Sequence, residues 1–466
     1  MRTTRYLSII GFLVAMLALA ACVAPAQPGA AEPEAGADET ASGLTFGDYP
    51  SGTMVIFGYG QPQFRQMFYE QALEDNPELA PGVTIETVQT EGEADARQKV
   101  QLSYTAGAWD ELPDALSSAP VSMQAMADGG ILLDITEYVE SMEDQLVPGS
   151  LDDLYYKGRI YCLPTDLRPQ LLFYNSELFE EYDIDPADMA TMEGYIEVGR
   201  QLQAASDGEV YLSFVDPGLY TWRYWGRRGL MPQAQARIWD DEGNVVIGSD
   251  PGAQLAFGTL ETLHEEGLLY NSTVFQPPLY EATRAGQVAT FYIGAFWDEF
   301  LRANLPDMEG KWRVMPAPVF EEIGVGGAPV LGIQCLVNKP DPVYAGLFIE
   351  LWEIFNFNAE AREKWTDLMV ELNAPFTNPI SLEMLEDPYW QVPSDYYGGQ
   401  SFRQMEGVGL QNPSVNLRVT EVDAEADQII STELEQWVAG SQTMEEAIAN
   451  MDAQLRERIG QAPAAE

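Results

Sequence analysis

The residues best suited to bind a ligand are aromatic side chains that alternate with arginines and neutral polar groups. The chain contains 10 tryptophans and 22 tyrosines, and the segment DPGLYTWRYWGRRG at residues 216–229 combines several of them with one aspartate and three arginines. Flat aromatic surfaces stack on the C–H faces of sugar rings, while Asp, Asn and Arg hydrogen-bond to the hydroxyl groups. A cationic ligand would instead require several carboxylates around an aromatic cage. The pattern therefore favours sugar binding, and packing of these aromatics in a core is the alternative.

Several kinds of catalytic and metal site are excluded. His264 is the only histidine, so a histidine-based triad could use only that residue, and a site with several histidine ligands is impossible. The sequence contains no Gly-x-Ser-x-Gly elbow and no phosphate-binding P-loop. A glycoside hydrolase needs two carboxylates across a sugar cleft, but no spacing marks out such a pair. We therefore expect no catalytic residue, no metal ligand and no cofactor.

The charge of the chain restricts its partners. The 466 residues include 73 acidic and 24 basic side chains, which gives a formal net charge of −49. Nucleic acids and anionic lipid surfaces both attract clustered lysines and arginines, so neither is an expected partner. Hydrophobic residues make up 46% of the chain, which excludes a disordered protein. The length suits two domains or a two-lobed unit.

The N-terminus has the features of an export signal. Arg2 and Arg5 precede an apolar run at residues 7–21, and this run is short for a membrane span. It leads through LAA into Cys22, a pattern that resembles a bacterial lipobox. The resemblance implies that Cys22 is lipidated and becomes the first residue of the mature chain. An ordinary signal peptide in which the cysteine falls there by chance is the alternative.

The residues after Cys22 are typical of a tether. Residues 23–42 are rich in Ala, Pro, Gly and Glu and have no apolar periodicity, so they offer no face to bury in a core. We expect a signal peptide at 1–21 and a lipidated, flexible segment at 22–52. Such a protein is exported and held by lipid at the extracytoplasmic face of the cell membrane.

Two further cysteines lie in apolar runs. Cys162 occurs in RIYCLP and Cys335 in GIQCLV, and both runs are typical of buried strands. Two separate buried thiols are the simpler interpretation. Because an exported protein can hold a disulfide, a bond between the two is the alternative.

Strand and helix patterns alternate in the first part of the chain. Apolar runs typical of strands occur at 54–57 and 83–88, and helical spacing occurs at 63–74 and 94–105. This alternation indicates an α/β lobe with a mostly parallel sheet. Amphipathic spacing predicts further helices at 252–265, 342–355, 360–372 and 424–438.

Polar side chains follow two of the predicted strands. Tyr59 and Gln61 come after the first strand, and Ser117 and Ser118 follow the strand that ends PDAL. Ligands bind at the carboxyl ends of parallel strands, so these four residues are candidate ligand contacts. Elsewhere, residues 160–175 read as two apolar β runs on either side of a polar turn at 164–169, which contains Asp166 and Arg168.

The order of several segments resembles a known family. They are AGAWDELPDAL, ADGGILLDITEYV, YKGRIYCLPTDLRPQLLFYNSELF, TRAGQVATFYIGAFW, WRVMPAPVF and GVGGAPVLGI. In this order, and after a lipobox, they resemble the extracellular solute-binding proteins of bacterial ABC importers, the family that contains maltose-binding protein. The resemblance covers residues 53–459.

The resemblance implies two α/β lobes joined by chain crossovers, with the ligand in the cleft between them. Carried over, the first lobe holds residues 53–165 and 329–374, and the second holds 170–324 and 378–460. The turn at 164–169 and the stretches near Gly326 and Pro375 would be hinge crossovers. Members of the family close around a ligand by hinge rotation.

The resemblance also selects ligand contacts. The 216–229 segment matches a loop that supplies a carboxylate and an aromatic platform, which indicates Asp216, Tyr220, Trp222 and Trp225. In GAFW, Phe296 and Trp297 match an aromatic that follows a glycine. The hinge would bring Asp166 and Arg168 to the cleft, although a buried hinge ion pair is the alternative. Where a polysaccharide-binding relative places an aromatic, this chain has SSAP, which favours a smaller or differently shaped sugar than maltodextrin.

The implied function is the substrate-binding component of an ABC transporter. A monomer anchored through Cys22 would capture a sugar or oligosaccharide and deliver it to the transmembrane permease subunits. A non-sugar solute such as an osmolyte, polyamine or peptide is the first alternative. A lipid-anchored glycoside hydrolase is the second.

Overall fold

The computed structural model of the chain describes residues 44–147, 150–218, 220–372, 374, 380–381 and 391–464. These residues belong to one compact unit. Within these ranges, no helix combines the length and the apolar character that a membrane crossing requires. The expectations for Cys22, for a signal peptide at 1–21 and for a crossover at Pro375 lie outside the described residues, as does the expected flexible segment 22–52 up to residue 43. In the described end of that segment, Tyr49 is buried and donates to Glu350, and a strand begins at Gly52.

The predicted alternation of strands and helices is confirmed. The strands β1 (Gly52–Gly58), β2 (Val83–Gln89) and β3 (Ala115–Ser118) lie parallel in the order β2–β1–β3. The helices that connect them are α2 (Pro62–Asp75) and α3 (Glu93–Ala106). The other predicted helices are also present, as α9 (Pro251–Glu265), α12 (Ala345–Phe357), α13 (Ala359–Glu371) and α15 (Asp423–Val438).

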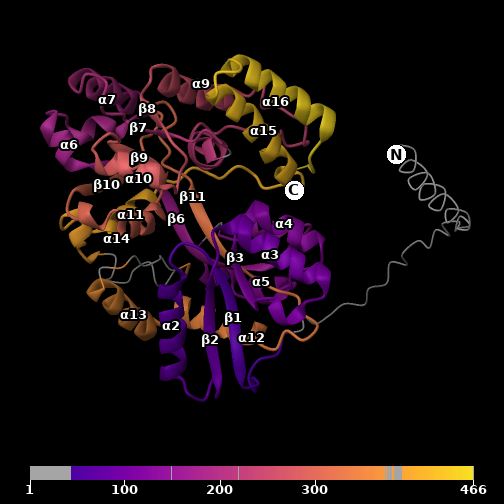
Figure 1. Cartoon of the computed structure of the whole chain (residues 1–466). Helices are drawn as coiled ribbons and strands as arrows, with labels where there is room; N and C mark the ends of the chain where they lie inside the picture. Colours follow the sequence, from indigo (N-terminus) through magenta and orange to yellow (C-terminus); the bar gives the residue numbers. More distant parts are fainter. Residues whose placement is uncertain are drawn as a thin grey trace, which may run out of the picture. The chain divides into compact units, whose positions relative to one another are not determined.

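Two antiparallel strands extend this sheet into the second half of the molecule. The strand β11 (Pro329–Leu336) pairs with β3 on one side and with β6 (Cys162–Asn175) on the other. The distal part of β6 then pairs with β9 (Thr290–Gly294) and β10 (Trp312–Pro316). Figure 1 shows β6 and β11 passing together between the two groups of helices. One mixed sheet therefore runs through both halves.

The turn predicted at 164–169 is wrong, because β6 is one continuous 14-residue strand. Pro164 and Pro169 lie within it, and the pairing of β6 with β11 shifts register between Gly332 and Ile333. Such a bulge is a position where a strand accommodates proline. A Cβ on Gly332 would lie 2.1 Å from the Asp166 carboxylate, so only glycine allows this close approach. The chain crosses here in extended form.

The remaining elements cover the sheet in two groups (Figure 1). The first group comprises α4 (Pro120–Asp128), α5 (Thr136–Glu140) and the hairpin β4 (Tyr155–Tyr156)–β5 (Arg159–Ile160). The second group comprises β7 (Ser213–Val215) paired with β8 (Leu269–Asn271), the π-helix η5 (Thr221–Leu230), α6 (Ser176–Glu181), α7 (Met192–Ala205), α8 (Met231–Gln233), α10 (Pro277–Arg284), α11 (Trp297–Asn304), α14 (Phe402–Gly409) and α16 (Met444–Arg458).

The buried apolar side chains form separate cores on the two sides of the crossing strands. One core takes its residues from 49–167 and 331–380, and we call the part of the chain around it lobe 1. Two further cores take theirs from 171–320 and 396–462, and we call that part lobe 2. Each lobe therefore has its own apolar interior, as the α/β two-lobed prediction requires.

Cys162 and Cys335 form a disulfide. They are opposed in the register of β6 and β11, which brings together two side chains that are 173 residues apart in the sequence. The interpretation of two separate thiols is therefore wrong. The bond closes a long loop at the end of the crossing strands that lies in lobe 1.

Candidate functional site

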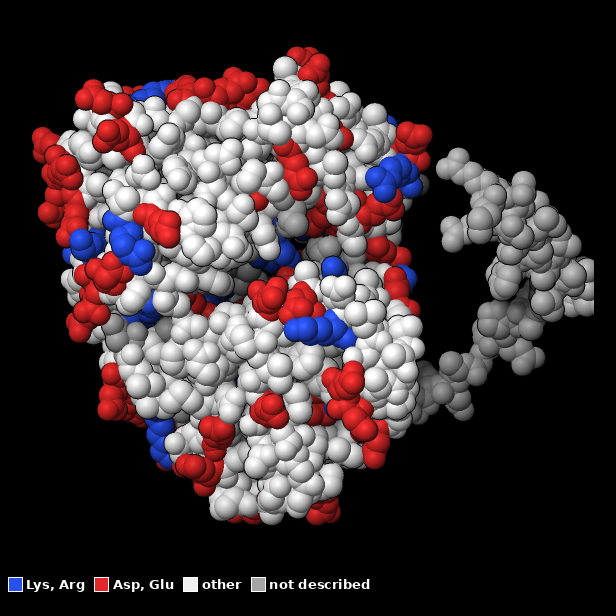
Figure 2. Space-filling model, in the orientation of Figure 1, with Lys and Arg blue, Asp and Glu red and all other residues white. Residues whose placement is uncertain are grey.

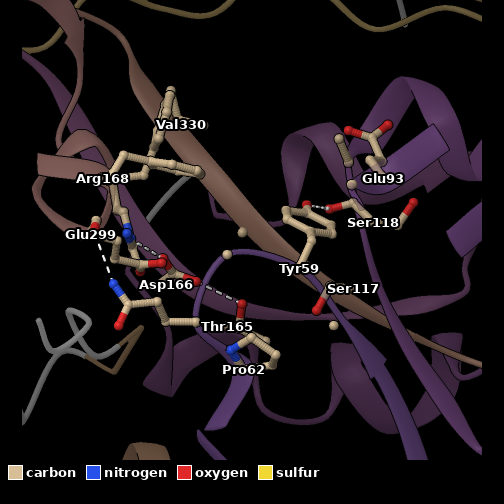
Figure 3. Close-up of a pocket in the computed structure, with 18 of the residues that line it drawn as sticks. Tyr59, Pro62, Glu93, Ser117, Ser118, Thr165, Asp166, Arg168, Glu299 and Val330 are labelled. Carbon is tan, nitrogen blue, oxygen red and sulfur yellow. Dashed lines mark hydrogen bonds and ion pairs between the residues drawn. The ribbon is translucent and has the colours of Figure 1, made fainter. Parts of the chain in front are cut away.

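A cavity of about 360 Å³ lies between the lobes, and both contribute to its wall. Lobe 1 supplies Tyr59, Gln61, Ser117 and Ser118. The crossing strands supply Asp166, Arg168 and Val330, and lobe 2 supplies Tyr220, Arg223, Tyr224, Arg228, Phe275, Phe296, Glu299 and Phe300. Figure 3 shows Tyr59, Ser117 and Ser118 toward one side of the pocket and Asp166, Arg168 and Glu299 toward the other. Eight of the twelve predicted ligand contacts therefore lie at one cavity.

The lobe 1 side of this cavity is built from strand ends. Because β1 and β3 are parallel, their carboxyl ends lie at the same edge of the sheet. The Tyr59 hydroxyl donates to the backbone carbonyl of Ser118 at 3.3 Å, and burial raises the pKa of Tyr59 above its usual range. Tyr59 thus stays neutral and presents its ring and hydroxyl to the cavity. The Gln61 amide donates to the backbone carbonyl of Glu299 at 2.8 Å, which links the two lobes.

The floor of the cavity is held by a buried ion-pair network. The Arg168 guanidinium pairs with the Asp166 carboxylate and, at 2.8 Å, with Glu299 of α11. Burial alone would raise the pKa of Asp166, but Arg168 and Arg65 hold it below its ordinary value. Burial alone would also lower the pKa of Arg168, but Asp166 and Glu299 raise it. The hinge ion pair considered from the sequence is therefore present, and both of its members line the cavity.

Aromatic rings form the lobe 2 wall. Tyr220 and Tyr224 stack with ring centroids 5.6 Å apart, and Phe296 lies 5.7 Å from Tyr224. Phe275 meets both tyrosines edge-on, and burial raises the pKa of Tyr224 to about 12. The wall is a continuous aromatic surface, and such a surface can stack on a sugar ring.

The three candidate tryptophans are buried in lobe 2. Trp222 and Trp225 are 1% exposed and Trp297 is 0% exposed. The Trp225 indole donates to the carbonyl of Phe214 at 2.9 Å, and the Trp222 indole donates to Asp427 at 2.7 Å. Neither Trp225 nor Trp297 lines a cavity described here, while Trp222 reaches the second one. These side chains pack in the core, as large apolar groups in a helix commonly do.

Asp216 positions a loop behind the aromatic wall. Its carboxylate accepts the N–H groups of Gly218 and Val274, both at 2.7 Å, and its side chain lines neither cavity. Burial raises the pKa of Asp216, and these backbone donors oppose the shift. Asp216 therefore fixes the loop that carries Phe275 and the loop that leads to Tyr220.

A second ion-pair network fixes α11, the helix that carries Glu299. Asp298 pairs with Arg302 at 2.6 Å and accepts the Tyr397 hydroxyl at 2.7 Å. Arg403 and Glu406 form a neighbouring buried pair. Burial raises the pKa of Glu406 to about 7, although Arg403 opposes the shift. The rigid support of α11 sets the position of the Glu299 carboxylate against Arg168.

A second cavity of about 470 Å³ continues the first. The two share the wall residues Glu91, Gly92, Glu93, Ala119, Tyr220, Arg223, Arg228, Val330 and Leu331. At the shared wall Arg223 of lobe 2 pairs with Glu93 of lobe 1 at 2.7 Å. Figure 2 shows basic side chains in the furrow between the two halves of the molecule. The space between the lobes therefore holds two adjoining cavities, and the ion pair between Arg223 and Glu93 connects the lobes where the cavities meet.

Sequence reasoning missed Arg223, Tyr224 and Arg228, which lie in the same 216–229 segment as the predicted contacts. The residues of this segment that line the first cavity are Tyr220, the adjacent pair Arg223 and Tyr224, and Arg228, so they recur about once per helical turn, while Trp222 and Trp225 are buried in η5. That spacing marks one face of a helix. The helical period of the segment could therefore have distinguished the residues that face the cavity from those that are buried in lobe 2.

Comparison with known proteins identifies the family. Residues 61–350 match the model of the bacterial extracellular solute-binding proteins. The chain is 24% identical to an arabinooligosaccharide-binding protein of Halalkalibacterium halodurans, over 82% of this chain and 83% of that one. It is also 24% identical to a lactose-binding protein of Rhizobium radiobacter, over 76% of this chain and 82% of the relative.

A solved structure has the same fold. The ABC transporter-associated binding protein of B. animalis subsp. lactis Bl-04, in complex with beta-1,6-galactobiose, superposes with a TM-score of 0.73 at 18% identity, covering 88% of this chain and 99% of that chain. The family match spans well over half of the chain, and the two-lobed architecture agrees with it. The protein belongs to the bacterial extracellular solute-binding protein family.

Proposed function

We propose that the protein is the sugar-binding component of an ABC importer. The observation that carries this proposal is the aromatic wall of Tyr220, Tyr224 and Phe296, which faces hydrogen-bonding groups of lobe 1 across a cavity. Stacking surfaces opposite polar groups are what a sugar ring requires. The relatives named for arabinooligosaccharide and lactose support the same ligand class.

The ion pairing of the cavity carboxylates favours a sugar over a polyamine. Of the four carboxylates that line the first cavity, Glu93, Asp166 and Glu299 are each paired with an arginine, and Glu91 alone makes no ion pair among the described residues. Most of the negative charge at the cavity is therefore already compensated. A hydrolase would need two carboxyl groups free to act as acid and as base or nucleophile. We infer that the site binds its ligand and returns it unchanged.

Closure of the lobes is the proposed mechanical step. The lobes consist, in this proposal, of residues 53–165 with 329–374 and residues 170–324 with 378–460, and β6 and β11 form the flexible connection. Contacts across the cleft, such as Gln61 with Glu299 and Glu93 with Arg223, would form on closure. The closed form would dock on the permease, and no bond of the sugar would change.

We also propose that lipid on Cys22 holds the protein outside the cytoplasmic membrane. The export-signal pattern and the Cys162–Cys335 disulfide support this, because disulfides persist in oxidising compartments. We expect the wild-type chain expressed in bacteria to incorporate labelled palmitate and the Cys22→Ala variant to incorporate none. Equal labelling of the two proteins would contradict the lipid anchor.

The aromatic wall is tested by truncating it. We expect Phe296→Ala and Tyr220→Ala each to weaken binding of the best sugar ligand by about 10- to 100-fold, because an aromatic contact surface at a binding hot spot contributes about 1.4–2.8 kcal/mol. Isothermal titration with arabino-, galacto- and malto-oligosaccharides measures the change. Trp109→Ala, which removes a 40% exposed ring outside the cavities, is the matched control. If both cavity variants bind as the control does, the wall is not the binding surface.

A further inference from the structure

We propose that the sugar bound in this cleft carries a carboxylate, as a uronic acid residue does, and that Arg228 binds it where the two cavities meet. This inference rests on the proposed sugar-binding function and specifies its ligand class. The observation behind it is the pairing of the arginines and carboxylates that line the two cavities.

Arg228 lacks a carboxylate partner among the residues that the structure describes. It is half-buried in η5 and lines both cavities, and its guanidinium lies 5.8 Å from the ring of Tyr224. Burial lowers the pKa of Arg228, and the adjacent positive charge of Arg223 lowers it further. The Glu93 carboxylate opposes this shift, but it is already paired with Arg223 at 2.7 Å. A guanidinium stays charged even so, and burying it without a carboxylate in direct contact is costly.

Of the five other arginines that line the two cavities, three are paired with a carboxylate, while Arg65 and Arg97 make no ion pair among the described residues. Arg168 pairs with Glu299 at 2.8 Å, Arg223 with Glu93 at 2.7 Å, and Arg227 with Asp427 at 2.8 Å. The chain has 73 acidic residues for 24 basic ones, so a carboxylate for Arg228 would be easy to supply. Its absence from the described part of the protein indicates that the counter-charge comes from the ligand.

A second cation reinforces this local charge. Arg97 of α3 borders the second cavity and makes no ion pair within the described ranges. Arg97 and Arg228 thus approach the same chamber from opposite lobes. The other charged residues that line this cavity are Arg223, Arg227 and the acids Glu91, Glu93, Asp95, Asp153 and Asp427, so an anionic group would be attracted by Arg97 and Arg228 themselves and not by a net positive cavity.

The geometry suits a sugar acid in particular. A guanidinium presents parallel N–H donors that match the two oxygens of a carboxylate. Tyr220 and Tyr224 lie beside Arg228 on the shared wall, so a ring could stack on the tyrosines while its carboxylate faces the arginine. A neutral sugar would leave Arg228 without a carboxylate in direct contact.

The test compares each acidic sugar with its own neutral form. Purified protein is titrated with trisaccharides of galacturonate, glucuronate and mannuronate, and with the same trisaccharides after reduction of the carboxyl groups to alcohols. We expect at least one acidic form to bind about 10- to 100-fold more tightly than its reduced counterpart, because a charged hydrogen bond has that effect. Arg228→Gln should remove this preference, so that the acidic and reduced forms bind the variant with similar affinity.

The controls separate the possible failures. Arg284→Gln removes an exposed arginine outside both cavities and should leave the affinities for both sugar forms unchanged. Arg228→Lys keeps the positive charge but loses the two parallel N–H donors, so it should retain only part of the preference for the acidic form. If the neutral forms, or neutral oligosaccharides alone, bind the wild type as well as or better than the acidic forms, this inference is overturned and the sugar-binding function stands. If no sugar of either kind binds, the proposed function fails with it.

Discussion

Replacing Arg168 by methionine is expected to lower the free energy of unfolding by about 3–5 kcal/mol. The Arg168 guanidinium pairs with Asp166 and Glu299, and the side chains of Arg168 and Asp166 are each only 9% exposed. Methionine fills much of the same space but leaves two carboxylates without their cation. Urea unfolding at neutral pH, followed by circular dichroism, measures the change.

The pH dependence of this loss gives a second readout. Without Arg168, the pKa of Asp166 should rise, so lower pH should neutralise the stranded carboxylate and reduce the difference between variant and wild type. Arg284→Met is the matched control, because it breaks a solvent-exposed pair with Asp307 and should therefore change the stability far less. Equal destabilisation by the two substitutions would show that the hinge network does not stabilise the fold.

Loss of the disulfide is the second large effect. We expect the double variant Cys162→Ala, Cys335→Ala to lose about 2–4 kcal/mol of unfolding free energy, because the bond restricts the unfolded chain over a separation of 173 residues. Urea unfolding with and without reductant measures it. The wild type should lose stability on reduction, and the double variant, which has no bond to reduce, should not respond.

A thiol titration decides whether reduction took place in that experiment. If the wild type exposes two thiols after treatment and unfolds at the same urea concentration as before, the disulfide contributes nothing to stability. If the wild type shows no free thiol from Cys162 or Cys335 in reductant-free buffer, either folded or unfolded, the disulfide is formed as described.

The sequence predicted the elements whose patterns are local. The helical spacing of residues 63–74 and 94–105 reappears in α2 and α3, and the strands between them are parallel, as their alternation with helices required. These patterns depend on which face of one element is buried. Each can therefore be read without knowing its neighbours.

The crossing strand and the disulfide depended on pairings distant in the sequence. Pro164 and Pro169 read as turn residues, but the register shift in β11 and the close approach at Gly332 keep β6 extended. Cys162 and Cys335 meet only because those two strands pair in one register. No local pattern records that register.

The site was predicted in part for the same reason. Tyr59 and Ser118 followed from the rule that ligands bind at the carboxyl ends of parallel strands. In the 216–229 segment the largest aromatics, Trp222 and Trp225, are buried in the core, and the cavity takes Tyr220 and Arg228 from the other face. That Arg228 has no ion pair within the described part of the chain could be recognised only once the positions of those carboxylates were known.

The central claim is that the cleft between the lobes binds a sugar and releases it unchanged. The most direct test is the melting temperature of the purified protein in the presence of neutral and acidic oligosaccharides, polyamines, osmolytes and peptides. A ligand that binds only the folded state raises this temperature by mass action. We predict a rise of several degrees with one class of oligosaccharide, which chromatography then recovers intact. A rise only with polyamines, osmolytes or peptides, or recovery of a cleaved sugar, would contradict the claim.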